Sequence, residues 1–244
     1  MYNFTEQFLT ISQAAEYLGI TETTLRRWDK NGSFSSTFIS PGGHRYYSLA
    51  DLGKKTKGIF RLGQDWASAI TPPALAKEFY CPTSDIFKAR LEHLAYELTN
   101  TKSVQNIASL ISSAAGEIGN NSYDHNIGNW PDITGTFFAY DIGKRMVVLA
   151  DRGVGILTTL RRIKHDLKND AEALNVAFTE VLSSRKSEHR GNGLKYVKAA
   201  IEKARANLSF QTGDAILTIS PDKTDFKILS AATTVHGCLS LLKF

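Results

Sequence analysis

Apolar residues recur at helical spacing in two short segments near the start of the chain. In the first segment, the apolar positions Ile11, Ala14 and Leu18 fall on one helix face, and Ser12 is a suitable N-cap. Thr21 can cap a second helix that stops at residues 31–32, an Asn-Gly pair. Two short helices joined by a glycine-containing turn predict a helix-turn-helix.

A hairpin is predicted directly after these helices. Residues 41–43, Pro-Gly-Gly, are strong turn signals and lie between the apolar pairs at 38–39 and 46–47. The hairpin would form a wing beside the two helices. Ser48 is then placed to cap a third helix over residues 48–55.

The rest of the chain alternates helical and strand patterns. Helices are expected at 66–80 and 84–98, followed by a long helix at 103–125 and a β-hairpin at 134–151. A charged helical stretch at 157–184 and a helix at 191–206 precede strands at 207–211, 215–220, 226–229 and 238–244. This order predicts an α+β protein. An all-α winged helix-turn-helix would be followed by an α/β sandwich, one mixed sheet covered by helices.

Composition narrows the class of protein. Hydrophobic residues make up 42% of the chain and charged residues 22%, as in soluble globular proteins. The two cysteines have no metal-ligand spacing, the first residues lack a signal-peptide pattern, and no apolar run is long enough to span a membrane. We therefore expect a cytoplasmic protein without membrane contact. The net charge of +5 is compatible with a polyanionic partner.

Polar and cationic residues cluster on the second helix and at the hairpin. Arginine can pair with guanine or with phosphate, and a recognition helix needs such donors. The alternative is that the arginines form a solvated helix face. The candidate DNA-binding residues are Thr23, Arg26, Arg27, His44, Arg45 and Tyr46.

Together, ISQAAEYLGITETTLRRW and PGGHRYYSLADL resemble the winged helix of the MerR family and its excisionase-like relatives over residues 8–55. The resemblance implies contacts with double-stranded DNA by Arg26, Arg27 and Arg45, and binding to a palindrome as a homodimer. Residues 32–40 depart from the family pattern, because they lack its proline and arginine. A long dimerisation helix with an effector-binding cysteine is also missing, so no metal-sensing role is expected.

Three motifs in the second half suggest nucleotide chemistry. Glu117 and Asn121 lie four residues apart on one helix face, with Asp124 beyond them. A carboxylate there can act as a general base, and an amide oxygen can coordinate Mg²⁺. Asp151 follows an apolar strand, where it can accept a hydrogen bond from an exocyclic amine.

Glycines accompany both of the remaining motifs. Asp151 is followed by Gly153, Gly155 and Ile156, and glycine lets the backbone turn sharply beside a planar base. The last motif opens a helix, where backbone N–H groups form a natural phosphate site. Its residues are Arg190, Gly191, Asn192, Gly193 and Leu194. Each motif alone also fits an ordinary helix or turn.

In this order, the motifs resemble those of the Bergerat-fold ATPases, which include gyrase B subunits, MutL-type repair proteins, histidine kinases and anti-sigma kinases, over residues 102–244. The resemblance implies binding of ATP and Mg²⁺, with Asn121 holding the metal and Asp151 reading adenine. It also implies a lid at 157–190. Thr218 is the candidate for a further adenine contact. The resulting domain prediction is a DNA-binding domain at 1–58, a helical connector at 59–101 and an ATPase domain at 102–244.

Glu117 bears on whether the chain would hydrolyse ATP or transfer its phosphate to a protein. By resemblance, a glutamate at this position belongs to the hydrolysing and serine/threonine-kinase branches, and His93 is too close to Glu117 to be a phosphoacceptor on its own helical hairpin. The first hypothesis is a regulator of transcription in which ATP binding or hydrolysis controls DNA binding or assembly. The alternative is an anti-sigma-like serine/threonine kinase that phosphorylates a partner protein and is targeted through its helix-turn-helix. A third option is a module that binds ATP without turning it over.

Overall fold

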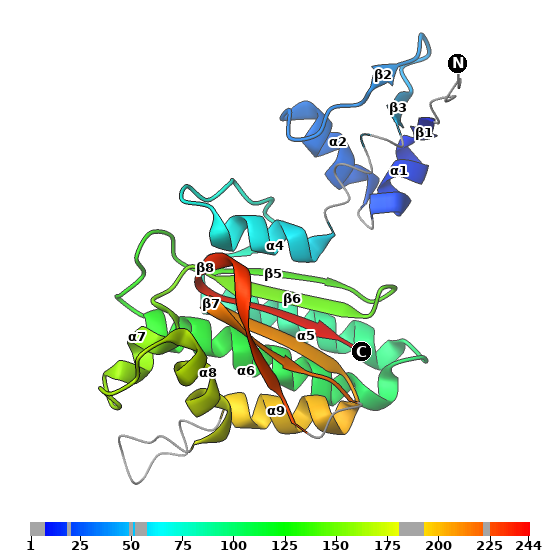
Figure 1. The fold of residues 1–244 in the computed structure, drawn as a ribbon. Coiled ribbons are helices and arrows are strands. Elements are labelled where there is room, and N and C mark those ends of the chain that lie inside the picture. Colours follow the sequence, from blue (N-terminus) through cyan, green and yellow to red (C-terminus); the bar gives the residue numbers. More distant parts are fainter. Residues whose placement is uncertain (1–7, 19–20, 49–50, 52–57, 181–192, 222–224) are drawn as a thin grey trace, which may run out of the picture. The chain divides into compact units, whose positions relative to one another are not determined.

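The computed structural model describes residues 8–18, 21–48, 51, 58–180, 193–221 and 225–244 (Figure 1). Contacts within the chain divide it into two compact units, Met1–Arg61 and Leu62–Phe244. Each unit is described by itself below.

The first unit combines two helices with a small antiparallel sheet. Its elements are β1 (Phe8–Thr10), α1 (Ile11–Leu18), α2 (Glu22–Lys30), β2 (Phe38–Ile39) and β3 (Arg45–Ser48). The sheet order is β1-β3-β2. The prediction that this unit is all-α was therefore wrong, because β3 pairs with β2 across the wing turn and with β1 on its other edge.

Local hydrogen bonds explain where these elements begin. The first helix is capped by Thr10 and not by Ser12 as predicted. The backbone N–H of Thr10 donates to Gln13 Oε1 at 3.0 Å, and the Gln13 N–H donates back to Thr10 Oγ1 at 3.4 Å. Thr21 caps α2 as predicted, since its Oγ1 accepts from the Thr24 N–H.

The predicted wing is confirmed. The Ser40 N–H donates to the His44 carbonyl and closes the β2–β3 hairpin. Ser48 Oγ accepts from the Asp51 N–H, as expected for the cap of a third helix. The remainder of that predicted helix lies outside the described residues.

The second unit holds one sheet and most of the helices. Its helical elements are α4 (Ile59–Ser68, which begins within the first unit), α5 (Ser84–Asn100), the 3₁₀ turn η1 (Gln105–Ile107), α6 (Ala108–Asn126), α7 (Gly155–Arg161), α8 (Asp170–Thr179) and α9 (Gly193–Ala204). Its strands are β4 (Tyr80–Cys81), β5 (Thr136–Asp141), β6 (Met146–Asp151), β7 (Asn207–Ile219) and β8 (Lys227–Lys243).

The sheet has the order β4-β5-β6-β8-β7, and every pairing between these strands is antiparallel. The predicted mixed sheet is thus corrected to an antiparallel one. The four C-terminal strand segments expected from the sequence join into two long strands. β7 continues through an irregularity between Thr212 and Ala215, where Gly213 has a positive φ of 50°.

Three long helices, α5, α6 and α9, cover one face of this sheet (Figure 1). Phe138 and Leu149 point into the core on that side, together with Phe87 from α5. Their neighbours Phe137 and Val148 point the other way and meet α4, where a Cβ atom at Gly63 would lie 3.1 Å from each of these side chains. Two parts of the expected helical connector at 59–101, α4 and α5, therefore pack on opposite faces of the sheet.

Of three further helices predicted from the sequence, two are confirmed and one is not. The helices expected at 84–98 and 103–125 are confirmed, whereas the one expected at 66–80 is not, because α4 ends at Ser68. The chain is an α+β protein, as predicted. Among the residues described, no helix is both long enough and apolar enough to span a membrane.

Candidate functional sites

In the first unit, α2 and the wing present their polar residues together. Thr23, Arg26 and Arg27 of α2 and His44 at the wing tip are exposed, while Leu25 and Trp28 turn inward to the core. A groove is lined by Arg26, His44, Arg45 and Tyr46 together with Thr10, Ile11 and Gly43. Four of the six predicted DNA-binding residues thus share one surface.

Two of these cations also have acidic partners within the unit. Arg26 pairs with Glu22 one turn earlier at 3.1 Å. The Arg45 Nε donates to Asp29, and Asp29 also accepts from the Ser36 N–H at 2.8 Å. Burial raises the pKa of Asp29, but these hydrogen bonds outweigh it and hold the pKa below its usual value. Arg45 therefore fixes the wing to the end of α2.

The aromatic residues at the wing have separate roles. Tyr46 stacks on Phe38 across the hairpin, with ring centroids 4.9 Å apart, and remains partly exposed. Tyr47 is fully buried and stacks on Phe34. Of these two tyrosines, Tyr46 is therefore the one placed for contact with a ligand.

In the second unit, α6 brings two of the predicted nucleotide motifs together. Glu117 and Asn121 lie one turn apart and both are partly exposed. Gly193, the first residue of α9, lies against them. A Cβ atom at Gly193 would be only 2.9 Å from Glu117 Oε2 and 3.3 Å from Asn121 Nδ2. A larger residue at this position would displace the ends of these two side chains, so glycine lets the start of α9 lie close to them.

Asp151 lies at the end of β6 and is held from three directions. Its Oδ2 accepts from Ser122 Oγ at 2.8 Å, and its Oδ1 accepts from the Gly153 N–H at 2.8 Å. The Cys238 N–H donates as well. Burial raises the pKa of Asp151 to about 6 against these hydrogen bonds. The residue is 3% exposed, so a ligand reaches its carboxylate only when neighbouring groups move.

Asn126 ties the turn after β6 to the same helix. Its Oδ1 accepts from the Val154 N–H at 2.8 Å, and its Nδ2 donates to the Ser122 carbonyl at 2.7 Å. Gly153 lies so close that a Cβ atom there would be 2.1 Å from Asn126 Nδ2. The sequence reasoning missed Asn126 and Ser122, although their four-residue spacing on the helix of Glu117 is a usable signal.

A threonine of β7 lies against the turn that follows Asp151, and it is Thr212 rather than the candidate Thr218. Thr212 Oγ1 accepts from the Ile156 N–H at 3.2 Å and donates to the Gly237 carbonyl at 3.0 Å. Thr212 also pairs with Cys238, the donor to Asp151. Thr218 lies six residues further along the strand and pairs with Lys227.

The other predicted nucleotide-binding residues are scattered. Asp124 is exposed, Leu194 is buried in the core below the sheet, and Ile156 is partly buried. Gly155 begins α7 with a positive φ of 76°. Arg190, Gly191 and Asn192 lie outside the described residues, as does the end of the predicted lid at 157–190.

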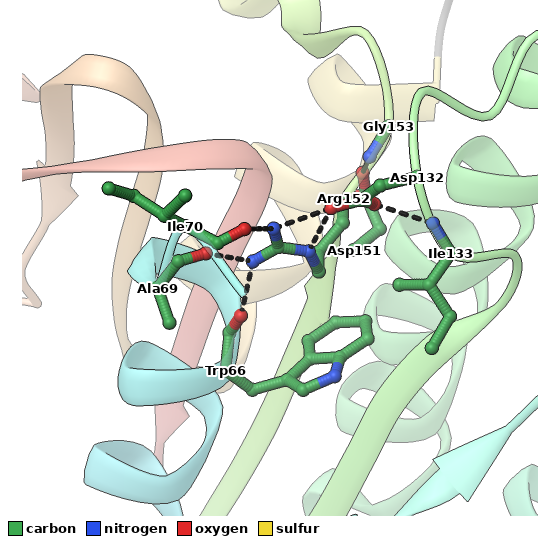
Figure 2. A network of polar contacts seen from close by, with 8 residues as sticks. All are labelled: Trp66, Ala69, Ile70, Asp132, Ile133, Asp151, Arg152 and Gly153. Atoms are coloured by element: carbon green, nitrogen blue, oxygen red, sulfur yellow. Dashed lines mark hydrogen bonds and ion pairs between the residues drawn. The ribbon is translucent and has the colours of Figure 1, made fainter. Parts of the chain in front are cut away.

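Arg152, which no motif singled out, is buried beside this site (Figure 2). Its guanidinium points to Asp132 and to the carbonyls of Trp66, Ala69 and Ile70. Burial raises the pKa of Asp132, but hydrogen bonds from Arg152 and from the Ile133 N–H outweigh it and hold the pKa below its usual value. The same turn that carries Asp151 is thus anchored to the end of α4.

The helix-turn-helix with its wing and cationic groove defines the first unit as a DNA-binding part. Residues 10–47 match the family model described as MerR family regulatory protein. This match supports a DNA-binding regulator with double-stranded DNA as a partner. A search of curated proteins finds no match to the sequence.

Proposed function

We propose that this chain is a DNA-binding regulator whose second unit binds and hydrolyses Mg-ATP, so that the nucleotide state controls DNA binding. The observation that carries the proposal is the position of α6. This helix holds Glu117 and Asn121 against Gly193 at the start of α9, and it holds Asp151 through Ser122. Described residues from three motifs that are far apart in the sequence therefore meet along one helix.

The residues present fit this ligand. A partly exposed amide oxygen at Asn121 is a hard ligand suited to Mg²⁺, and the N–H groups at the start of α9 are suited to phosphate. The carboxylate of Asp151 would accept the exocyclic amine of adenine. ATP would supply the phosphoanhydride bond that is broken. Protein partners and a homodimer on a palindrome remain predictions.

Glu117 would take a proton from the attacking water. Replacing it with glutamine keeps its shape but removes the base, so we expect phosphate release from Mg-ATP to fall by about 100-fold or more, while ATP binding is retained. The measurement is phosphate release by the full chain, with ATP affinity measured by calorimetry. The matched control is Glu202→Gln, which affects a surface pair with Lys198 on α9.

Each result of this experiment has a distinct meaning. Turnover that is lost only in Glu117→Gln supports the ATPase. Binding without turnover would identify a nucleotide sensor, and transfer of phosphate to a protein would favour the kinase alternative. A wild-type protein that shows no calorimetric signal with Mg-ATP would refute the nucleotide site altogether.

DNA binding is proposed to use Arg26, Arg27 and the wing. We expect Arg45→Ala to weaken binding to a mixed-sequence duplex and to reduce the slope of log affinity against log salt by about one, because one phosphate contact is lost. Titrations at several salt concentrations measure this slope. Arg162→Ala, an exposed change in the second unit, is the control. Equal slopes for Arg45→Ala and the wild type would remove the wing from the interface.

A further inference from the structure

Arg152 lies in sequence between two residues of the candidate nucleotide site, but its side chain points toward the end of α4. Asp151 and Gly153 are its neighbours in the chain, and the Gly153 N–H donates to the Asp151 carboxylate. The guanidinium instead reaches the last turn of α4 and the residues that follow it, as Figure 2 shows.

Every nitrogen of this guanidinium donates to an oxygen. Nε donates to Asp132 Oδ2 at 2.7 Å, and Nη1 donates to the carbonyls of Trp66 at 2.6 Å and Ala69 at 2.8 Å. Nη2 contacts Asp132 Oδ2 at 2.5 Å and the Ile70 carbonyl at 3.4 Å. Four of the five N–H groups of the arginine thus donate hydrogen bonds, and the ion pair with Asp132 adds a further contact.

Because the guanidinium is buried, no single one of its acceptors can move away without a cost in free energy. The Arg152 side chain is 0% exposed, so water cannot replace an acceptor that moves away. The cation also lies at the C-terminal end of α4, where the helix dipole favours positive charge. A displacement of the turn at 151–153 must therefore move the end of α4 with it, or leave a buried cation without its acceptors.

The helix α4 is also the path of the chain from one unit to the other. It begins at Ile59, whereas the first compact unit extends to Arg61. Its C-terminal half packs within the second unit, where Trp66 and Ala67 are buried. A structural change at the C-terminal end of α4 would therefore act on the helix that joins the DNA-binding unit to the rest of the protein.

We propose that Arg152 couples the nucleotide site to α4, so that a nucleotide bound at Asp151 changes the end of this helix and, through it, DNA binding. The inference rests on the proposed function, since it needs a ligand at Asp151. That carboxylate is covered in this structure, so binding requires movement of its surroundings, and Asp151 and Gly153 flank Arg152 directly. The coupling must be reciprocal. If bound nucleotide changes the affinity for DNA by a given factor, bound DNA changes the affinity for nucleotide by the same factor.

The direct test is amide hydrogen exchange at residues 66–71 of the full chain, with and without a non-hydrolysable ATP analogue and Mg²⁺. We expect the analogue to change exchange in the wild type and to change the affinity for duplex DNA by about fivefold or more. Asp132→Asn and Arg152→Lys should lose most of both responses while calorimetry still detects the analogue. The matched control is Asp141→Asn, at a surface pair with Lys144, which should keep both responses.

The outcomes separate this inference from the proposed function. No calorimetric binding to the wild type would overturn the nucleotide site and the coupling together. Binding without a change at residues 66–71 would overturn the coupling alone, and this measurement needs no variant. A full response in folded Asp132→Asn or Arg152→Lys would show that the signal does not pass through the guanidinium.

Discussion

Replacing Arg152 with alanine is expected to lower the free energy of unfolding of the second unit by about 3–5 kcal/mol. The substitution removes four hydrogen bonds and an ion pair with Asp132 from a side chain that is 0% exposed. Three carbonyls, those of Trp66, Ala69 and Ile70, lose a buried partner, and a cavity forms where the guanidinium was. Asp132 contributes less to the loss, because its side chain is 36% exposed and water can solvate it.

Equilibrium denaturation in urea measures this effect. Arg162→Ala is the control, because Arg162 is exposed at the end of α7 and its loss should change stability by no more than about 0.5 kcal/mol. If the two variants unfold at the same urea concentration, the Arg152 network does not stabilise the fold and the proposed coupling loses its physical basis.

The elements that the sequence predicted well are those with a long and regular pattern. The helix α6 and the hairpin of β5 and β6 lie close to where their periodicity placed them. The two-residue strand β4 has too few residues to show an alternation, and it forms because Tyr80 and Cys81 pair with β5. The first helix cap was missed although the Thr10–Gln13 pair has the spacing of a capping box.

The position of Thr218 illustrates the uncertainty over where the C-terminal strands begin and end. Separate strands were predicted at 207–211 and 215–220, and the candidate Thr218 belongs to the second of them. In the structure β7 passes through Gly213 with an irregularity, and Thr212 lies against Ile156 in the turn after Asp151. Arg152 was missed for another reason. Its partners Trp66 and Asp132 lie far away in sequence, so no local spacing could indicate them.

The buried carboxylate of Asp151 is expected to make stability depend on pH. Its pKa is raised from 3.8 to about 6 in the folded chain, so folding favours the protonated form. The stabilising contribution is complete below pH 3.8 and is lost as the pH rises through about 6. A shift of this size corresponds to about 3 kcal/mol. Asp151→Asn cannot titrate and should lack this loss.

The quantity to measure is the difference in free energy of unfolding between the wild type and Asp151→Asn at several values from pH 4 to pH 7. Because other groups titrate in both proteins, their contributions cancel in this difference. We expect the wild type to lose about 2 kcal/mol relative to the variant across this window, most of the full effect. Ser122→Ala removes a hydrogen bond to the ionised form, so it should move the window to higher pH. A difference that is constant with pH would mean that Asp151 is ionised throughout, and that the polar groups around it outweigh the effect of burial.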